Sequence, residues 1–216
     1  MVVVLAIIVT ITSIALLGQT SFNRSMVLTD IAYTLAFSIR EAQSLGLSSR
    51  VFGGTQNTGY GVHFVRGVTN SYTLFADISP AASGNVQSAS VCPGHSVGSG
   101  PEARPGDCIY NGASENVRSY ALNRGFTILS FCGTQTSNGS MRCSNSASSL
   151  MLDSLSIVYL RPNTQSVVTG VRSGTRIPLS DATIRVASPD GAAERCVYVS
   201  KAGQVAVFQK GETSCP

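Results

Sequence analysis

One pentapeptide of this chain matches a catalytic motif of hydrolases. Residues 94–98 read GHSVG, the pattern G-x-S-x-G of a turn that exposes a nucleophilic serine, here Ser96. That turn must lead into a helix, but SGPEARPG follows, in which no helix can start. Its triad also places the histidine after the serine, whereas His63 and His95 both precede Ser96. The chain order of the chymotrypsin triad is met by His63, Asp77 and Ser96, but nothing in the sequence marks an oxyanion hole. We therefore predict no catalytic residues and no enzyme activity.

Cysteine and histidine also stand close enough together to suggest a zinc site. CPGH at 92–95 has the spacing Cys-x2-His, and Cys108 could add a third ligand. Structural zinc sites use four ligands, usually as two close pairs, and Cys108 has no neighbour at such a spacing. SDAT at 180–183 and SPDGAAE at 188–194 could offer oxygens to calcium, but SPDG is better explained as a turn. We predict neither a metal nor a cofactor.

The six cysteines are better explained as disulfides, because their number is even and they fall into near neighbours along the chain. The pairs that proximity suggests are Cys92 with Cys108, Cys132 with Cys143, and Cys196 with Cys215. Six cysteines allow 15 pairings, and the short separation makes Cys132 with Cys143 the firmest of the three. Disulfides indicate an oxidising location on the outer side of a membrane; six reduced thiols buried in a cytosolic protein are the alternative.

The chain begins with an uncharged apolar run at residues 1–17, which is followed by Gly18. The run lacks the basic start and the cleavage site of a signal peptide. As a transmembrane helix its length of about 25 Å is a little short for about 30 Å of hydrocarbon. The third interpretation is a segment that first sits in a membrane and later packs against copies of itself. The residues predicted for this membrane and assembly role are Val2, Val4, Leu5, Ile7, Ile8, Ile11, Ile14 and Leu17.

From residue 28 onward the pattern is amphipathic, with apolar residues at steps of three and four. We expect one nearly continuous helix from Met1 to about Leu45 that stops at Gly46. Its apolar stripe should dock on the rest of the chain, whereas Ser38 should lie on the flanking face. The predicted docking residues are Leu28, Ile31, Leu35 and Ile39.

Beyond residue 50, short alternating stretches separated by turns predict antiparallel strands. They lie at 60–66, 71–77, 126–132, 154–162, 182–188, 195–200 and 204–209. The stretch between Ala81 and Gly112, rich in Gly, Ser and Pro, is too long for a plain connector and needs a tie, which a Cys92–Cys108 bridge would supply. The expected fold class is α+β. Residues 1–17 would form a membrane or filament-core helix, 18–50 an amphipathic helix and 51–216 an antiparallel β domain.

The chain resembles the type IV pilin-like proteins in four stretches: MVVVLAIIVTITSIALLG, IREAQSLGLSSRV, GYGVHF and RCVYVSKAGQVAVF. It is most similar to their minor pseudopilins with two packed sheets, the GspH/FimT-like class. The resemblance implies a long helix on two small antiparallel sheets with disulfide-clipped loops. In that family a basic leader ends in Gly at a cleavage point, and a Glu follows shortly after. We expect the corresponding leader and first mature residues to precede Met1, so cleavage and N-methylation are assigned to no residue.

The resemblance implies a structural function. We expect a minor pilin or pseudopilin of a type IV pilus or type II secretion-like filament, anchored in the inner or cytoplasmic membrane by a single-pass helix before assembly. Its β domain would face the periplasm or the exterior, and its partners would be the membrane and other pilin or pseudopilin subunits. The alternative is a minor pilin that binds DNA or a surface, which scattered basic residues do not favour. These are Arg118, Arg124, Arg142, Arg161, Arg172, Arg176, Arg185, Arg195, Lys201 and Lys210.

Overall fold

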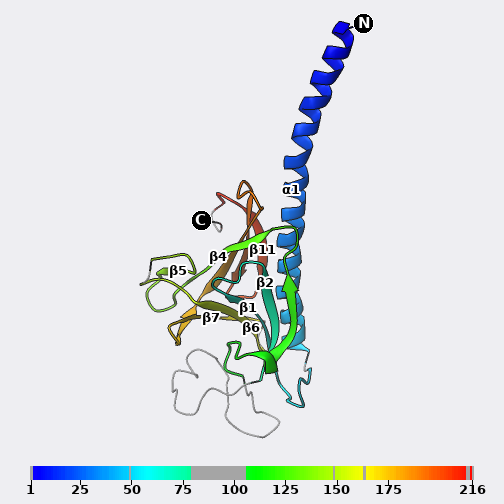
Figure 1. The fold of residues 1–216 in the computed structure, drawn as a ribbon. Helices are drawn as coiled ribbons and strands as arrows, with labels where there is room; N and C mark the ends of the chain where they lie inside the picture. The colour runs from blue at the N-terminus through cyan, green and yellow to red at the C-terminus, as the bar shows by residue number, and fades with distance from the viewer. Residues whose placement is uncertain are drawn as a thin grey trace.

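One helix lies along a domain of two antiparallel β-sheets (Figure 1). The computed structural model describes residues 2–48, 50–78, 106–147, 149–162, 164–212 and 215, with the side chains of 14–22 left out. The helix, α1, spans Val2–Leu47, and a 3-10 turn, η1, spans Ala113–Glu115. The N-terminal end of α1 projects beyond the β domain, and its second half runs alongside the domain.

The first sheet has six strands in the order β3-β2-β1-β6-β7-β8, and the second has five in the order β11-β10-β9-β4-β5. The strands of the first sheet are β1 (Gly59–Val65), β2 (Ser71–Asp77), β3 (Asn116–Ala121), β6 (Ser154–Tyr159), β7 (Ser166–Arg172) and β8 (Thr175–Leu179). Those of the second are β4 (Thr127–Thr134), β5 (Met141–Cys143), β9 (Asp181–Ala187), β10 (Glu194–Ser200) and β11 (Val205–Gln209).

The alternation of side chains along β1 gives the first sheet two buried faces. Val62 and Phe64 join the main core, which contains residues of both sheets and of α1. His63 points to the other face, where Phe75 and Val158 belong to a second, smaller core. The first sheet therefore carries side chains in both cores.

One stripe of α1 docks on the main core. Leu28, Leu35 and Ile39 are buried, and Ile31 is partly buried and packs against the same core. This part of the helix contacts strands of both sheets, chiefly β1, β6, β10 and β11. Burying a leucine or isoleucine stabilises a fold by about 1.5–3 kcal/mol, so the stripe is a main attachment between helix and sheets.

The predicted fold class, α+β with two small sheets, is wrong. Among the residues whose backbone and side chains are both described, 42% lie in strands and 23% in helices, so the structure is mostly β, and its sheets have six and five strands. The strands that the sequence pattern missed are β3, β5, β7 and β8. Three of these, β3, β5 and β8, lie at sheet edges, where a partly exposed strand needs no regular alternation of apolar residues.

The predicted membrane span at residues 1–17 is also wrong. In the part of the chain that the structure describes, no helix combines the length and the hydropathy that crossing a bilayer requires. The apolar run ends at Leu17, after about 25 Å of helix, and polar residues follow from Gln19. The single-pass membrane location predicted from this run is therefore wrong as well.

Candidate interaction surface

The start of α1 leaves large apolar side chains uncovered. Between Val2 and Ile11 these side chains are 53–82% exposed, and they point to all sides of the helix because they occupy nearly every position. Val2, Val4, Leu5, Ile7, Ile8 and Ile11, six of the eight residues predicted for assembly, belong to this set. The other two, Ile14 and Leu17, lie where side chains are not described. We call residues 2–13 the apolar segment.

Further along α1, an exposed stripe faces away from the β domain. Met26, Tyr33 and Phe37 are more than half exposed and recur at steps of seven and four, which places them on one face of the helix. That face lies opposite the docking residues. Single exposed apolar residues are ordinary on protein surfaces, but a set of them on one helix that also carries the apolar segment is typical of an interaction surface.

A furrow runs along one side of α1, between the helix and the residues that follow β3. Two hollows of about 460 and 300 Å³ form it, and Val27 and Arg124 line both. Its floor consists of buried residues of α1 and of both sheets: Leu35, Tyr72, Phe126 and Val186. Its rim consists of exposed polar residues: Arg24, Asp30, Thr34, Asn123 and Arg124.

Two stacked tyrosines fix the wall of this furrow. The rings of Tyr72 in β2 and Tyr120 in β3 lie 5.1 Å apart and nearly parallel. The hydroxyl of Tyr120 donates to Glu41 Oε2 at 2.6 Å, and the hydroxyls of Tyr72 and Ser38 lie 2.9 Å apart. Burial raises the pKa of Tyr72 to about 12, so its phenol stays neutral. The hydrogen bonds hold both rings against α1.

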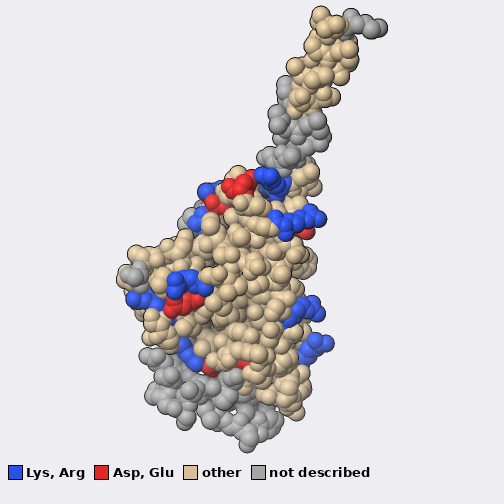
Figure 2. Space-filling view, viewed as in Figure 1, with Lys and Arg blue, Asp and Glu red and all other residues tan. Residues whose placement is uncertain are grey.

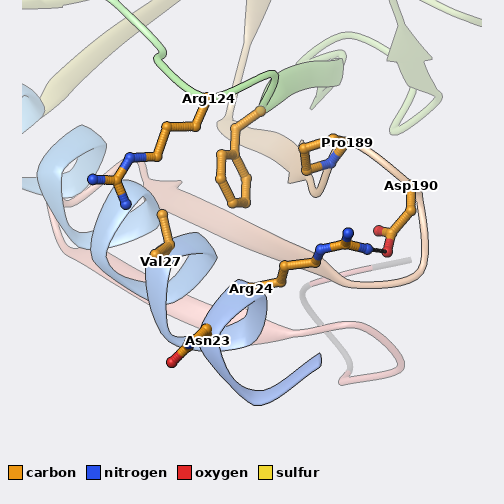
Figure 3. Close-up of a pocket in the computed structure, with 7 residues that line it drawn as sticks. Asn23, Arg24, Val27, Arg124, Pro189 and Asp190 are labelled. Atoms are coloured by element: carbon orange, nitrogen blue, oxygen red, sulfur yellow. Dashed lines mark hydrogen bonds and ion pairs between the residues drawn. The ribbon is translucent and has the colours of Figure 1, made fainter. Parts of the chain in front are cut away.

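An ion pair closes one end of the furrow (Figure 3). Arg24 of α1 reaches Asp190 in the turn between β9 and β10, with 2.5 Å between Nη1 and Oδ2. Hydrogen bonds from Ser188 and Ala192, and then from Arg24, lower the pKa of Asp190 to about 2. Asp190 is therefore ionised at neutral pH, and this end of the furrow is charged while its floor is apolar.

Of the residues considered for catalysis, the structure describes His63 and Asp77, and these two have separate sets of hydrogen-bond partners. His63 Nδ1 lies 2.9 Å from Ser156 Oγ, and its ring packs against Tyr110, 5.0 Å between centroids. Burial lowers the pKa of His63 to about 4, so its imidazole is neutral and enclosed. Asp77 lies in a different set of contacts. The motif at 94–98, with its serine and histidine, lies outside the described residues.

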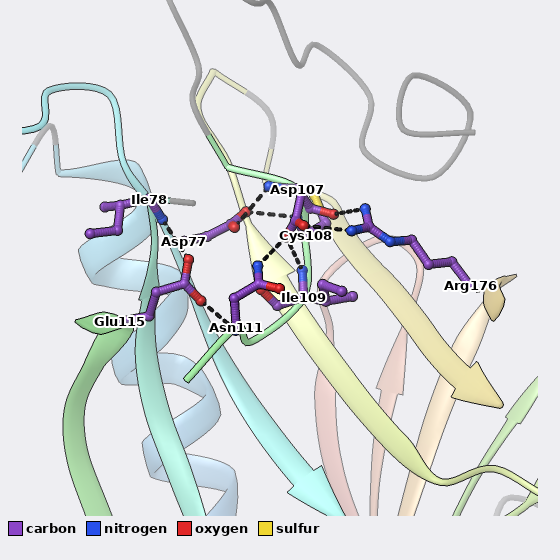
Figure 4. Close-up of polar contacts among 8 residues, drawn as sticks. All are labelled: Asp77, Ile78, Asp107, Cys108, Ile109, Asn111, Glu115 and Arg176. Carbon is purple, nitrogen blue, oxygen red and sulfur yellow. Dashed lines mark hydrogen bonds and ion pairs between the residues drawn. The ribbon is translucent and has the colours of Figure 1, made fainter. Parts of the chain in front are cut away.

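Asp77 belongs to a cluster of three buried carboxylates, Asp77, Asp107 and Glu115 (Figure 4). Asp77 Oδ1 and Oδ2 accept the backbone N–H groups of Asp107 at 2.9 Å and Cys108 at 2.8 Å. Complete burial, and then the neighbouring Asp107 carboxylate, raise the pKa of Asp77 well above its usual value. Asp107 pairs with Arg176 of β8 at 2.6 Å. The cluster thus ties the end of β2 and residues 107–115 to the sheet, which is a structural task.

Metal ligation and a basic surface were the remaining possibilities, and Cys92 and His95, considered for zinc, lie outside the described residues. Among the described residues, no group of three or more His, Cys, Asp and Glu side chains is arranged to hold a metal. Of the ten predicted basic residues, four form ion pairs with carboxylates, namely Arg118, Arg176, Arg185 and Lys210. On the face seen in Figure 2, basic side chains stand in separate groups, several of them beside acidic ones.

Two disulfides close loops at the edges of the second sheet. Cys132 of β4 is bonded to Cys143 of β5, and Cys196 of β10 is bonded to Cys215, which are two of the three predicted pairs. Cys108 is also disulfide-bonded, and Cys92, its predicted partner, lies outside the described residues.

The sequence pattern did not indicate the furrow, because the furrow depends on β3, a strand that the pattern did not predict. Comparison with protein families, curated proteins and solved structures finds no match for this chain.

Proposed function

We propose that this chain is a structural subunit of a filament whose copies pack through α1. The single observation that carries the proposal is the exposure of the apolar segment, 53–82% for its large side chains from Val2 to Ile11. Burial of apolar surface yields roughly 25 cal/mol per Å², so this segment gains free energy wherever it is covered. The resemblance to minor pilins and pseudopilins implies the same use of the N-terminal helix.

The position of the segment favours an open assembly. It projects from one end of the molecule. The exposed stripe of Met26, Tyr33 and Phe37 instead belongs to the half of α1 that runs alongside the β domain, on the helix face that points away from it. When one subunit's projecting segment meets a different surface on the next, the contact is heterologous, and it repeats without limit unless the rotation closes a ring. A filament is the expected product.

Substitution Ile7→Asp in the full chain tests the proposal. Ile7 is 53% exposed, so the charge is tolerated in the single chain but is buried in an assembly, where an unpaired carboxylate is strongly unfavourable. We expect the fraction that sediments as filaments, checked by negative-stain microscopy, to fall at least tenfold. The matched control is Val68→Asp in the β1–β2 turn, which removes a similarly exposed side chain and should leave assembly unchanged. Normal filaments from Ile7→Asp would contradict the proposal.

A further inference from the structure

We infer that the furrow is the acceptor site for the apolar segment of a second copy of this chain. The inference rests on the proposed function and adds to it the surface that receives the projecting helix. The floor and the segment are chemically alike. Leu35, Tyr72, Phe126 and Val186 supply the floor, and the segment contains no charged residue.

The two threonine hydroxyls of the segment are already paired within its own helix. Thr10 Oγ1 donates to the carbonyl of Ala6 at 3.0 Å, and Thr12 Oγ1 donates to that of Ile8 at 2.7 Å. The two threonine hydroxyls thus enter an apolar furrow without losing a hydrogen-bond partner. A buried hydroxyl that lacks a partner is unfavourable, and this pairing avoids that loss.

The dimensions of the furrow and the segment agree. The residues of α1 that line the furrow run from Asn23 to Leu35, about 18 Å of helix, and residues 2–13 span about 17 Å. An apolar cavity of about 150 Å³ holds one benzene molecule, so the smaller hollow of about 300 Å³ has room for two apolar side chains. Two residues one helical turn apart, such as Ile7 and Ile11, supply such a pair.

The rim restricts what binds to the furrow. Asp30, Thr34, Asn123 and Arg124 are exposed around the apolar floor, and the Arg24–Asp190 ion pair closes one end. A hydrophobic centre with a polar, hydrated rim is the usual anatomy of a protein–protein interface. A charged helix would lose the hydration of its charged side chains over this floor, whereas the segment has no charged side chain.

The occupant must come from another copy. Because α1 is helical from Val2 to Leu47, the chain cannot fold its first residues back onto its own furrow. For two parallel helices, the centre of the segment reaches the centre of the furrow after a shift of about 32 Å along the helix axis. The contact is therefore head-to-tail. It leaves a free apolar segment at one end of the assembly and a free furrow at the other.

Filling the furrow tests the inference in the full chain. Ala121 lines the smaller hollow and is exposed, so Ala121→Trp occupies the space without entering the core. We expect at least a tenfold loss of sedimenting filaments with an unchanged melting temperature. The matched control is Ala113→Trp in η1, which is also exposed and lines neither hollow.

A photo-crosslinker at position 122, also in the hollow, identifies the occupant. With mixed light and isotope-labelled chains, Leu122→p-benzoylphenylalanine should give intermolecular crosslinks to residues 2–13. Crosslinks to other residues only, no crosslinks, or normal assembly of Ala121→Trp would overturn the inference. The proposed function stands without this acceptor site if one of these results is obtained, the parent chain forms filaments and Ile7→Asp still abolishes them. If the parent chain forms no filament, the proposed function itself fails.

Discussion

The carbonyl oxygen of Tyr159 in β6 lies so close to Gly46 of α1 that a Cβ atom on the glycine would stand 2.3 Å from it. The sequence suggests that Gly46 stops the helix, but α1 continues to Leu47 and Gly46 is buried. The glycine instead permits the close approach of helix and sheet, because any side chain there would meet backbone.

Gly46→Ala should therefore destabilise the domain, by about 1–3 kcal/mol, since the helix must move away from β6. Alanine favours a helix by about 1 kcal/mol over glycine, so a purely local effect would have the opposite sign. Urea unfolding measures the difference. Ser44→Ala, exposed on the same helix, should stay within about 0.5 kcal/mol of the parent.

Leu35→Ala should destabilise the domain by about 2–5 kcal/mol, because it removes a side chain that is only 2% exposed and leaves a cavity between helix and sheets. Thr34, its exposed neighbour, is the control, and Thr34→Ala should be close to neutral. The melting temperatures of the two variants provide the measurement. Equal melting of Leu35→Ala and the parent would show that the helix is not held by its docking stripe.

Ser38→Ala should also destabilise the domain, by about 1–3 kcal/mol, because the Tyr72 hydroxyl loses its partner in a buried site. The sequence pattern places Ser38 on the flanking face and predicts no effect, but Ser38 is 3% exposed. A double-mutant cycle with Tyr72→Phe separates the pair from its surroundings. The double variant should lose less stability than the sum of the two single variants.

His63 should make stability depend on pH below neutrality. Its pKa in the fold is about 4, below the ordinary value of 6.5, because burial disfavours the imidazolium. Its contribution is therefore complete above pH 6.5 and is lost as the pH falls toward 4, in total by roughly 3 kcal/mol. The slope of the unfolding free energy against pH reports how many protons are taken up on unfolding. Between pH 6.5 and 5 this number should be smaller by about one in His63→Gln than in the parent. Parallel slopes for variant and parent would contradict the assignment.

Removing the disulfide between Cys132 and Cys143 should lower the free energy of unfolding by about 3 kcal/mol in the chain-entropy model, since the bridge joins two residues with a sequence separation of 11. The double variant Cys132→Ser/Cys143→Ser tests this in denaturant. Ser137→Ala, in the same loop and exposed, is the control and should not change stability. Peptide mapping without reduction should return this pair from the parent protein.

The sequence by itself determined the features that depend on local patterns. Steps of three and four in apolar residues identified the docking face with Leu28, Leu35 and Ile39, because helical geometry fixes which residues share a side. Proximity along the chain identified the pairs Cys132–Cys143 and Cys196–Cys215. Alternation identified strands such as β1 and β10, whose faces are largely buried.

Only the tertiary structure decided the features that depend on which segments meet. β3 became a strand by pairing with β2, and with Tyr120 it formed the wall of a furrow that no periodicity indicates. Ser38 and Gly46 acquired their roles from Tyr72 and Tyr159, which come from distant strands. A pattern within one segment shows which side chains share a face, but not which partner atoms that face will meet, and burial of polar groups and close approach both depend on the partner.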